Sequence, residues 1–174
     1  GMSYDSSQYQ VKVDVTGASG KSEAVATISK GNETVDTATF TNTYELNAAK
    51  VSLDDKVKKE LKGRELKAGE FSFEVREISG GDSWVVATGV NDKNGNVDFD
   101  KNELIFDKVG TYNYLVKETS TDGKGVTTDK NQYNVTITVS DDGKGNLVAK
   151  DVVTNLVNDE TITFRNVYEA EDVR

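Results

Sequence analysis

Apolar and polar residues alternate along most of this 174-residue chain. Alternation with a period of two indicates β-strands that bury one face. Turn signals rich in Gly, Asn and Asp, such as DKNGN and TDGKG, separate the alternating segments. The sequence therefore predicts an all-β fold, a sandwich of antiparallel sheets. The clearest alternating segments are 9–15, 71–75, 112–116, 133–139 and 162–168.

The sequence also repeats itself without a gap. Residues 5–45 resemble residues 129–169, so that Asn42 corresponds to Asn166 at a spacing of 166 − 42 = 124. A chance similarity would not keep the same spacing across all of these residues. We interpret the chain as a fragment of a tandem array.

The repeat divides the chain into three parts. Residues 46–170 are expected to form one complete β-sandwich domain. Residues 1–45 correspond to the last three strands of a preceding, neighbouring repeat, and residues 171–174 form a tail.

Composition excludes several classes of protein. The chain has no His and no Cys, which rules out Ser–His and Cys–His nucleophilic systems, disulfides and ordinary structural zinc sites. Its net charge of −9 argues against nucleic acid as a partner. No apolar run approaches the ~20 residues that span a bilayer, so no membrane contact is expected of this fragment.

Three polar residues fall where the alternation predicts buried positions. Lys59, Glu118 and Asn166 each continue the apolar side of a strand: the first, a middle one and the last of the complete domain. A buried lysine, carboxylate and carboxamide are costly unless they satisfy one another. We therefore expect the three side chains to meet in the core.

The segments that carry these residues are KVKKELKGRELKAGEFSFEV, GTYNYLVKE and ITFRNVYEA. Together they resemble the streptococcal pilin isopeptide linkage domain, a CnaB-type immunoglobulin-like module of Gram-positive pilins and cell-wall-anchored adhesins. The resemblance implies an isopeptide bond between Lys59 and Asn166, assisted by Glu118 as the acid/base. One departure is Asp55, whose charge on the inward face of the first strand indicates a bulge there.

General chemistry explains how such a bond would form. Burial lowers the pKa of a lysine and raises that of a carboxylic acid. A neutral amine can then attack the asparagine side-chain carbonyl, with a carboxyl group carrying protons, and ammonia leaves. The reaction occurs once per molecule, so the protein is not expected to be a turnover enzyme.

A calcium-like spacing of acidic and amide side chains occurs in NDKNGNVDFDKNE. Val97 stands where a calcium loop of this kind requires glycine at its sixth position. A hairpin turn at Asn94 and Gly95 explains the run more simply. We expect no metal and no cofactor.

The leading functional hypothesis is a structural stalk or backbone module of a Gram-positive surface pilus or adhesin. It would lie outside the cell, at the cell wall, beside neighbouring repeats or pilin subunits of the same fibre. The signal peptide and the sorting signal would lie outside this fragment. The alternative is an adhesive binding module that recognises a host protein or glycan through loops such as SGGDSW, around Trp84.

The partial repeat, residues 1–45, lacks part of the candidate site and part of a sandwich. Counterparts of Lys59 and Glu118 would fall at 59 − 124 and 118 − 124, which lie before residue 1, so Asn42 is expected to keep its amide. Strands of residues 1–45 would expose an apolar face to water. We expect that face to be covered by a second molecule in a homodimer, or by the complete domain of its own chain.

Overall fold

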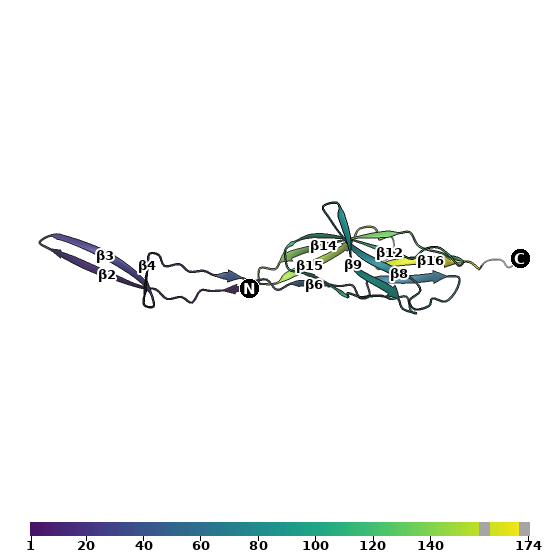
Figure 1. The fold of residues 1–174 in the computed structure, drawn as a ribbon, viewed down its shortest axis with the longest axis horizontal. Helices are drawn as coiled ribbons and strands as arrows, with labels where there is room; N and C mark the ends of the chain where they lie inside the picture. Colours follow the sequence, from purple (N-terminus) through teal and green to yellow (C-terminus); the bar gives the residue numbers. More distant parts are fainter. Residues whose placement is uncertain (157–160, 171–174) are drawn as a thin grey trace. The chain divides into compact units, whose positions relative to one another are not determined.

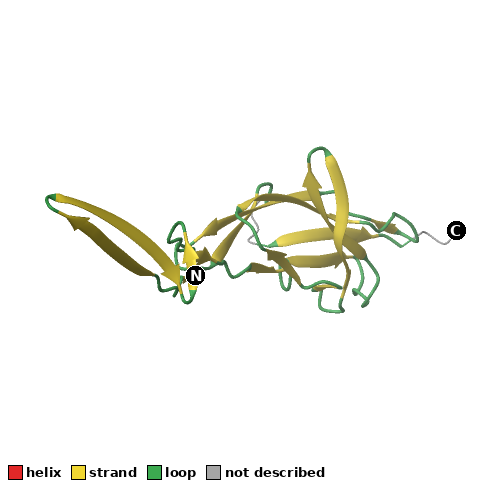
Figure 2. Cartoon of the chain, turned by 60° about the vertical axis from the view of Figure 1, so that its left-hand side comes forward, coloured by secondary structure: helices red, strands yellow, loops and turns green. Residues whose placement is uncertain are grey.

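A computed structural model describes residues 1–156 and 161–170. Strands and turns make up these residues, which contain no helix (Figure 2). No segment of this part of the chain is a helix that could cross a membrane. The chain divides into two compact units, Gly1–Glu45 and Leu46–Arg174, which we call unit 1 and unit 2. The expected tail, 171–174, lies outside the described residues.

Unit 2 contains a six-stranded antiparallel sheet, in the order β10-β9-β8-β12-β14-β15. Figure 1 labels β8, β9, β12, β14 and β15 of this sheet. Alternating burial along β8, β12 and β14 places their apolar side chains on one face, as the period-two pattern predicts. The strands of this sheet are β8 (Ser72–Ser79), β9 (Asp82–Asn91), β10 (Val97–Phe99), β12 (Gly110–Glu118), β14 (Gln132–Asp141) and β15 (Leu147–Val153).

Two smaller sheets complete unit 2, in the orders β13-β16-β7 and β11-β6. Their strands are β6 (Ala49–Ser52), β7 (Val57–Lys62), β11 (Glu103–Phe106), β13 (Val126–Thr127) and β16 (Ile162–Tyr168). The ring of Phe164 on β16 packs 5.3 Å from that of Phe73 on β8 and 5.2 Å from that of Tyr133 on β14. These contacts join the layers, so the all-β, immunoglobulin-like sandwich is confirmed.

One pair of strands differs from the antiparallel expectation. β16 pairs with β7 in parallel, with Phe164 opposite Lys59 and Asn166 opposite Leu61. Parallel neighbours need a long connection, and here most of unit 2 lies between the two strands. The first and last long strands of the domain are therefore direct neighbours.

The irregularity expected at Asp55 is a turn between two strands. β6 ends at Ser52 and β7 begins at Val57, and Asp55 lies between them with a positive φ of 59°. The Asp55 side chain is exposed, so its charge never enters the core. Burial then alternates afresh along β7, which buries Val57 and Lys59.

Unit 1 contains two small sheets, β2-β3-β4 and β1-β5. Only Thr43 and Tyr44 pair as a strand where the repeat predicts a full third strand. In unit 2 the equivalent strand, β16, pairs along its length with β7, and unit 1 has no counterpart of β7. The strands of unit 1 are β1 (Met2–Ser3), β2 (Gln10–Ala18), β3 (Lys21–Lys30), β4 (Glu33–Val35) and β5 (Thr43–Tyr44).

Candidate functional site

Lys59 lies in the middle of β7 and points into the core. Its side chain has no exposed surface, and its Nζ lies 4.7 Å from the centre of the Phe71 ring and 6.0 Å from that of Phe73. Aromatic faces attract a cation but supply no hydrogen bond. The amine therefore depends on a polar partner inside the core.

Glu118, the last residue of β12, is that partner. Its Oε2 accepts a hydrogen bond of 2.8 Å from the Lys59 Nζ, and its Oε1 accepts one of 2.8 Å from the Asn166 Nδ2. The Glu118 side chain, like that of Lys59, is fully buried. One carboxyl group thus joins the lysine nitrogen and the asparagine nitrogen.

Asn166 lies on β16, two residues after Phe164 and on the same face of the strand. Because Phe164 is opposite Lys59 in the parallel ladder, this spacing places Asn166 diagonally beside the lysine. Its Oδ1 accepts a hydrogen bond of 2.7 Å from the backbone N–H of Asp129. Every buried side-chain nitrogen and oxygen in the described residues has a hydrogen-bond partner.

The surroundings make it easier for the Lys59 amine to lose its proton than it would be in water. Burial lowers the pKa of Lys59, and the hydrogen bond to Glu118 opposes that shift only in part. A lysine with a lowered pKa has a larger neutral fraction, and a neutral amine is a nucleophile. The site therefore places a lysine amine with a lowered pKa and a carboxamide nitrogen on the two oxygens of one carboxyl group.

Asp129 is a contributor that sequence reasoning missed. Its backbone N–H contacts the Asn166 carbonyl, while its carboxylate accepts hydrogen bonds from the backbone N–H groups of Arg165, at 2.8 Å, and Asn131, at 2.9 Å. These bonds hold Asp129 against β16. Its sequence signal was the aspartate at the equivalent place in the repeat, Asp5.

Asn91 is a second missed residue. It is buried, and its side chain accepts a hydrogen bond from the Phe71 backbone N–H and donates to the Lys67 carbonyl. These bonds fix the loop that brings the Phe71 ring over the Lys59 amine. A single buried asparagine at the end of a strand gives no signal in the sequence alone.

The calcium-like run forms a turn that supports the lysine strand. The Asp92 carboxylate accepts hydrogen bonds from the backbone N–H groups of Asn94 and Asn96, and the Gly95 carbonyl accepts one of 2.7 Å from the Lys59 N–H. No group of three or more potential metal-ligating side chains comes together in the described part of the chain.

A comparison with protein families identifies the family of the chain. The family model of FctA, described as the Spy0128-like isopeptide containing domain, matches residues 1–45 and 56–169. The chain belongs to the FctA family. The resemblance to a streptococcal pilin isopeptide domain is thereby confirmed, and the match includes residues of both units. A search of the curated proteins finds no match.

The FctA family indicates a pilin-type, isopeptide-containing structural domain. Domains of this kind are typical of the cell surface, where pilin subunits associate with one another. The family match itself does not say which residues of this chain would be bonded.

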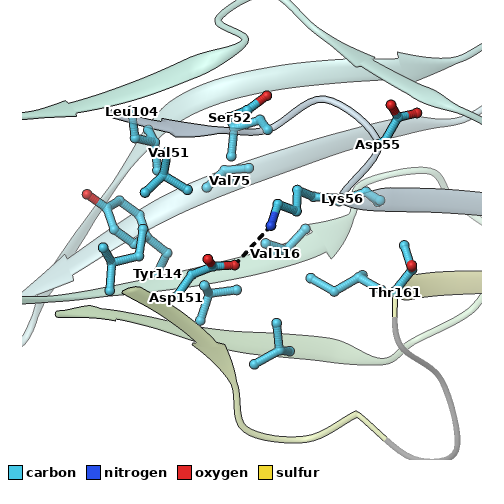
Figure 3. A pocket seen from close by; sticks show the side chains of 16 residues that line it. Val51, Ser52, Asp55, Lys56, Val75, Leu104, Tyr114, Val116, Asp151 and Thr161 are labelled. Atoms are coloured by element: carbon cyan, nitrogen blue, oxygen red, sulfur yellow. Dashed lines mark hydrogen bonds and ion pairs between the residues drawn. The ribbon is translucent and has the colours of Figure 1, made fainter. Parts of the chain in front are cut away.

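A cavity of about 110 Å³ lies elsewhere in the FctA sandwich. Figure 3 shows valine side chains among its lining, with an ion pair of 3.2 Å between Lys56 and Asp151. None of Lys59, Glu118 and Asn166 lines this cavity, so it is separate from the buried site.

Trp84 lies within β9, opposite Glu77 of β8, and is 44% exposed. The sequence hypothesis placed it in a binding loop. The β8–β9 hairpin instead turns at Gly80 and Gly81, and Trp84 belongs to the strand that follows. Trp84 is therefore a strand residue of the FctA sheet.

Proposed function

We propose that unit 2 is a structural module of a Gram-positive surface fibre, braced by an isopeptide bond between the Lys59 Nζ and the Asn166 Cγ. One observation carries this proposal: the buried Glu118 carboxyl accepts a hydrogen bond from the nitrogen that would attack and from the nitrogen that would leave. A purely structural ion pair would not require a carboxamide on the second oxygen.

The proposed reaction balances with these groups alone. The Lys59 amine gives a proton to Glu118 and attacks the Asn166 Cγ, which forms the new C–N bond. The negative charge that develops on Oδ1 is stabilised by the Asp129 N–H, in the manner of an oxyanion hole. Glu118 then delivers a proton to Nδ2, the old C–N bond breaks, and ammonia leaves.

The folded core supplies what an amide substrate needs. Amides are poor electrophiles, so the reacting groups must be held close together. The pairing of β7 with β16 makes their strands neighbours, and both side chains bond to the same Glu118 carboxyl group. The product is an amide between two residues of the same chain, which regenerates no site. We therefore assign one autocatalytic event per molecule and no turnover.

The bond would also carry mechanical load. Tension pulling on the two ends of unit 2 would enter β7 before Lys59 and leave β16 after Asn166. With the two residues joined, the load bypasses the chain between them, which spans 166 − 59 = 107 positions. The strands between Lys59 and Asn166 would then be shielded from the load.

The surface setting follows from the same proposal. We place the protein outside the cell at the Gram-positive cell wall, beside pilin subunits or repeats of the same fibre. The chain has no cysteine, so disulfides cannot brace it there. An amide brace fills that role and does not respond to reductants.

Intact-mass measurement of the folded chain tests the proposal. We expect a mass lower than the sequence mass by one ammonia, and a cross-linked peptide containing Lys59 and Asn166 in tandem mass spectrometry. Glu118→Ala should give a folded chain at full mass. The matched control is Lys58→Met. Lys58 is the neighbouring lysine on the same strand, and its Nζ donates a hydrogen bond to the Asn96 side chain rather than to Glu118. Full mass in the folded parent chain would refute the bond.

A further inference from the structure

A single loop, residues 119–128, connects two groups of the candidate site. Glu118 immediately precedes the loop, and its carboxyl group bonds to both nitrogens of the site. Asp129 immediately follows the loop, and its backbone N–H donates to the Asn166 Oδ1. Both groups act on the same carboxamide in the proposed reaction. The conformation of this loop therefore fixes where the proton carrier and the N–H donor lie relative to each other.

The middle of the loop is a tight hairpin. Lys124 and Gly125 form its two-residue turn, with a positive φ at both positions. The residues on either side of the turn, Gly123 and Val126, exchange backbone hydrogen bonds of 3.0 and 2.9 Å. The chain then runs along β16 as β13, whose pairing ends at Thr127. The ladder therefore stops two residues short of the N–H donor.

The Asp122 carboxylate closes the base of the hairpin. Its Oδ1 accepts hydrogen bonds from the Thr128 backbone N–H, at 2.8 Å, from the Thr128 hydroxyl, at 2.6 Å, and from the Lys130 Nζ, at 2.8 Å. Thr128 is 4% exposed and directly precedes Asp129 in the chain. These bonds, chiefly the one from Lys130, hold the pKa of the Asp122 carboxyl well below its usual range, so the carboxylate keeps its charge at ordinary pH.

A hollow of about 220 Å³ opens beside the N–H donor and is lined in part by Asp129 and Lys130. Water can enter a polar hollow of this size, where it would compete for a backbone N–H that is free to turn away from Asn166. A donor stabilises a developing negative charge best when its direction is fixed before the reaction. The Asp129 carboxylate fixes the residue on one side by its bond to β16, and Asp122 does so on the other side through Thr128.

We propose that Asp122 is a positioning residue for the isopeptide bond of unit 2. Acting through Thr128, it holds the Asp129 N–H toward the Asn166 Oδ1. The negative charge that develops there is then stabilised as soon as the amine attacks. Asp122 gives and takes no proton, and the bonds that form and break are those of the proposed reaction. This inference rests on the function proposed for unit 2.

The rate of linking in the full chain tests the proposal. The chain is recovered unlinked from inclusion bodies in urea and refolded by dilution, and intact mass then gives the fraction that has lost ammonia at each time. Folding is followed separately by the fluorescence of Trp84, the single tryptophan. Removing an oxyanion-hole donor costs about 10²–10³-fold in rate, so loosening one should slow linking in Asp122→Ala by about 10-fold.

Two variants of the same hydrogen-bond network provide controls. Asp122→Asn is the conservative variant, because all three bonds go to Oδ1 and an asparagine keeps that acceptor. Lys130→Met removes the surface ion pair but leaves both bonds from Thr128 in place. We expect both variants to link at nearly the rate of the parent.

A third control separates positioning from stability. Val139 is buried on β14, opposite Gly110 at the end of β12 that lies far from Glu118. Val139→Ala should therefore lower the free energy of unfolding through lost packing. We expect this variant, once folded, to link at the rate of the parent, because the loop that holds the N–H donor is intact.

Three results would overturn the inference. They are an Asp122→Ala chain that folds and links as fast as the parent, an Asp122→Asn chain as slow as Asp122→Ala, and a Val139→Ala chain slowed to the same extent. Should Asp122→Ala fail to fold, Thr128→Val provides the second test, since it removes the hydroxyl bond with little change of shape; linking at the parent rate would overturn the inference there too. A parent chain that folds but stays at full mass is a separate result, which refutes the bond itself.

Discussion

Replacing Lys59 with methionine removes the proposed bond with little other change. Methionine has nearly the length of the lysine stem, carries no charge into the core, and packs well against aromatic rings such as Phe71. Lys59→Ala would instead leave a cavity, whose cost would add to that of the missing bond. The Met variant therefore isolates the cross-link.

The magnitude follows from the loop that the bond closes. Lys59 and Asn166 are 107 positions apart, and the chain-entropy relation for cross-links gives about 4.8 kcal/mol for a loop of that length. A loss of 1 kcal/mol shifts the melting temperature of a domain of this size by about 3 °C. We therefore expect Lys59→Met to melt about 15 °C below the parent.

Thermal unfolding followed by circular dichroism measures this difference, with intact mass confirming that the parent is linked and the variant is not. Lys58→Met is the control, since it removes a lysine from the same strand without touching the site, and it should melt within about 2 °C of the parent. A linked parent and an unlinked Lys59→Met variant that melt together would refute the bracing role.

Two further predictions concern the surroundings of the bond. In the Glu118→Ala variant, which we expect to stay unlinked, Lys59 remains buried with its pKa below 10.5. The unfolded state then binds more protons than the folded state, so the free energy of unfolding should rise with pH up to about 10.5. Adding Lys59→Met should abolish that rise in denaturant titrations. Gly95→Ala should lower the free energy of unfolding by more than Gly143→Ala does. Both glycines have a positive φ, which costs about 1 kcal/mol with alanine, but only at Gly95 would the added Cβ lie 2.3 Å from the Lys59 carbonyl oxygen. Equal losses would show that the turn does not support β7.

The alternation of apolar and polar residues predicted which way each site residue points. Strand parity assigns Lys59, Glu118 and Asn166 to the inside, and the structure brings all three together. Parity does not say which strands are neighbours. The parallel pairing of β7 with β16 depends on the path of the whole chain, so sequence reasoning expected antiparallel sheets and missed it.

The same limit explains the third strand of unit 1. Residues 40–44 carry the pattern of β16, yet only Thr43 and Tyr44 pair, with β1. A strand needs a partner for its backbone groups, and β16 has β7 where unit 1 has none. Local pattern therefore predicts the capacity to form a strand, and tertiary partners decide its length.

Asp129 was missed for a different reason. Its contribution to the site is a backbone N–H, which every residue except proline has, so residue type carries no signal. What distinguishes Asp129 is the pair of hydrogen bonds that its carboxylate accepts from the backbone N–H groups of Arg165 and Asn131. The repeated aspartate at Asp5 was visible in the sequence, but its meaning depended on the hydrogen bonds.

The two halves of the site differ in how much of the fold each requires. The hydrogen bond from the Asp129 N–H to the Asn166 Oδ1 spans 37 residues. Its counterpart in unit 1, from the Asp5 N–H to the Asn42 Oδ1, forms without a strand equivalent to β7. The contacts from Glu118 to Asn166 and from Lys59 to Glu118 span 48 and 59 residues and need strands from both layers of the sandwich. The acceptor can therefore be organised first, while the amine arrives only when β7 pairs with β16. Because the reaction requires both, the proposed bond can form only in a completed sandwich, and it then makes that arrangement permanent.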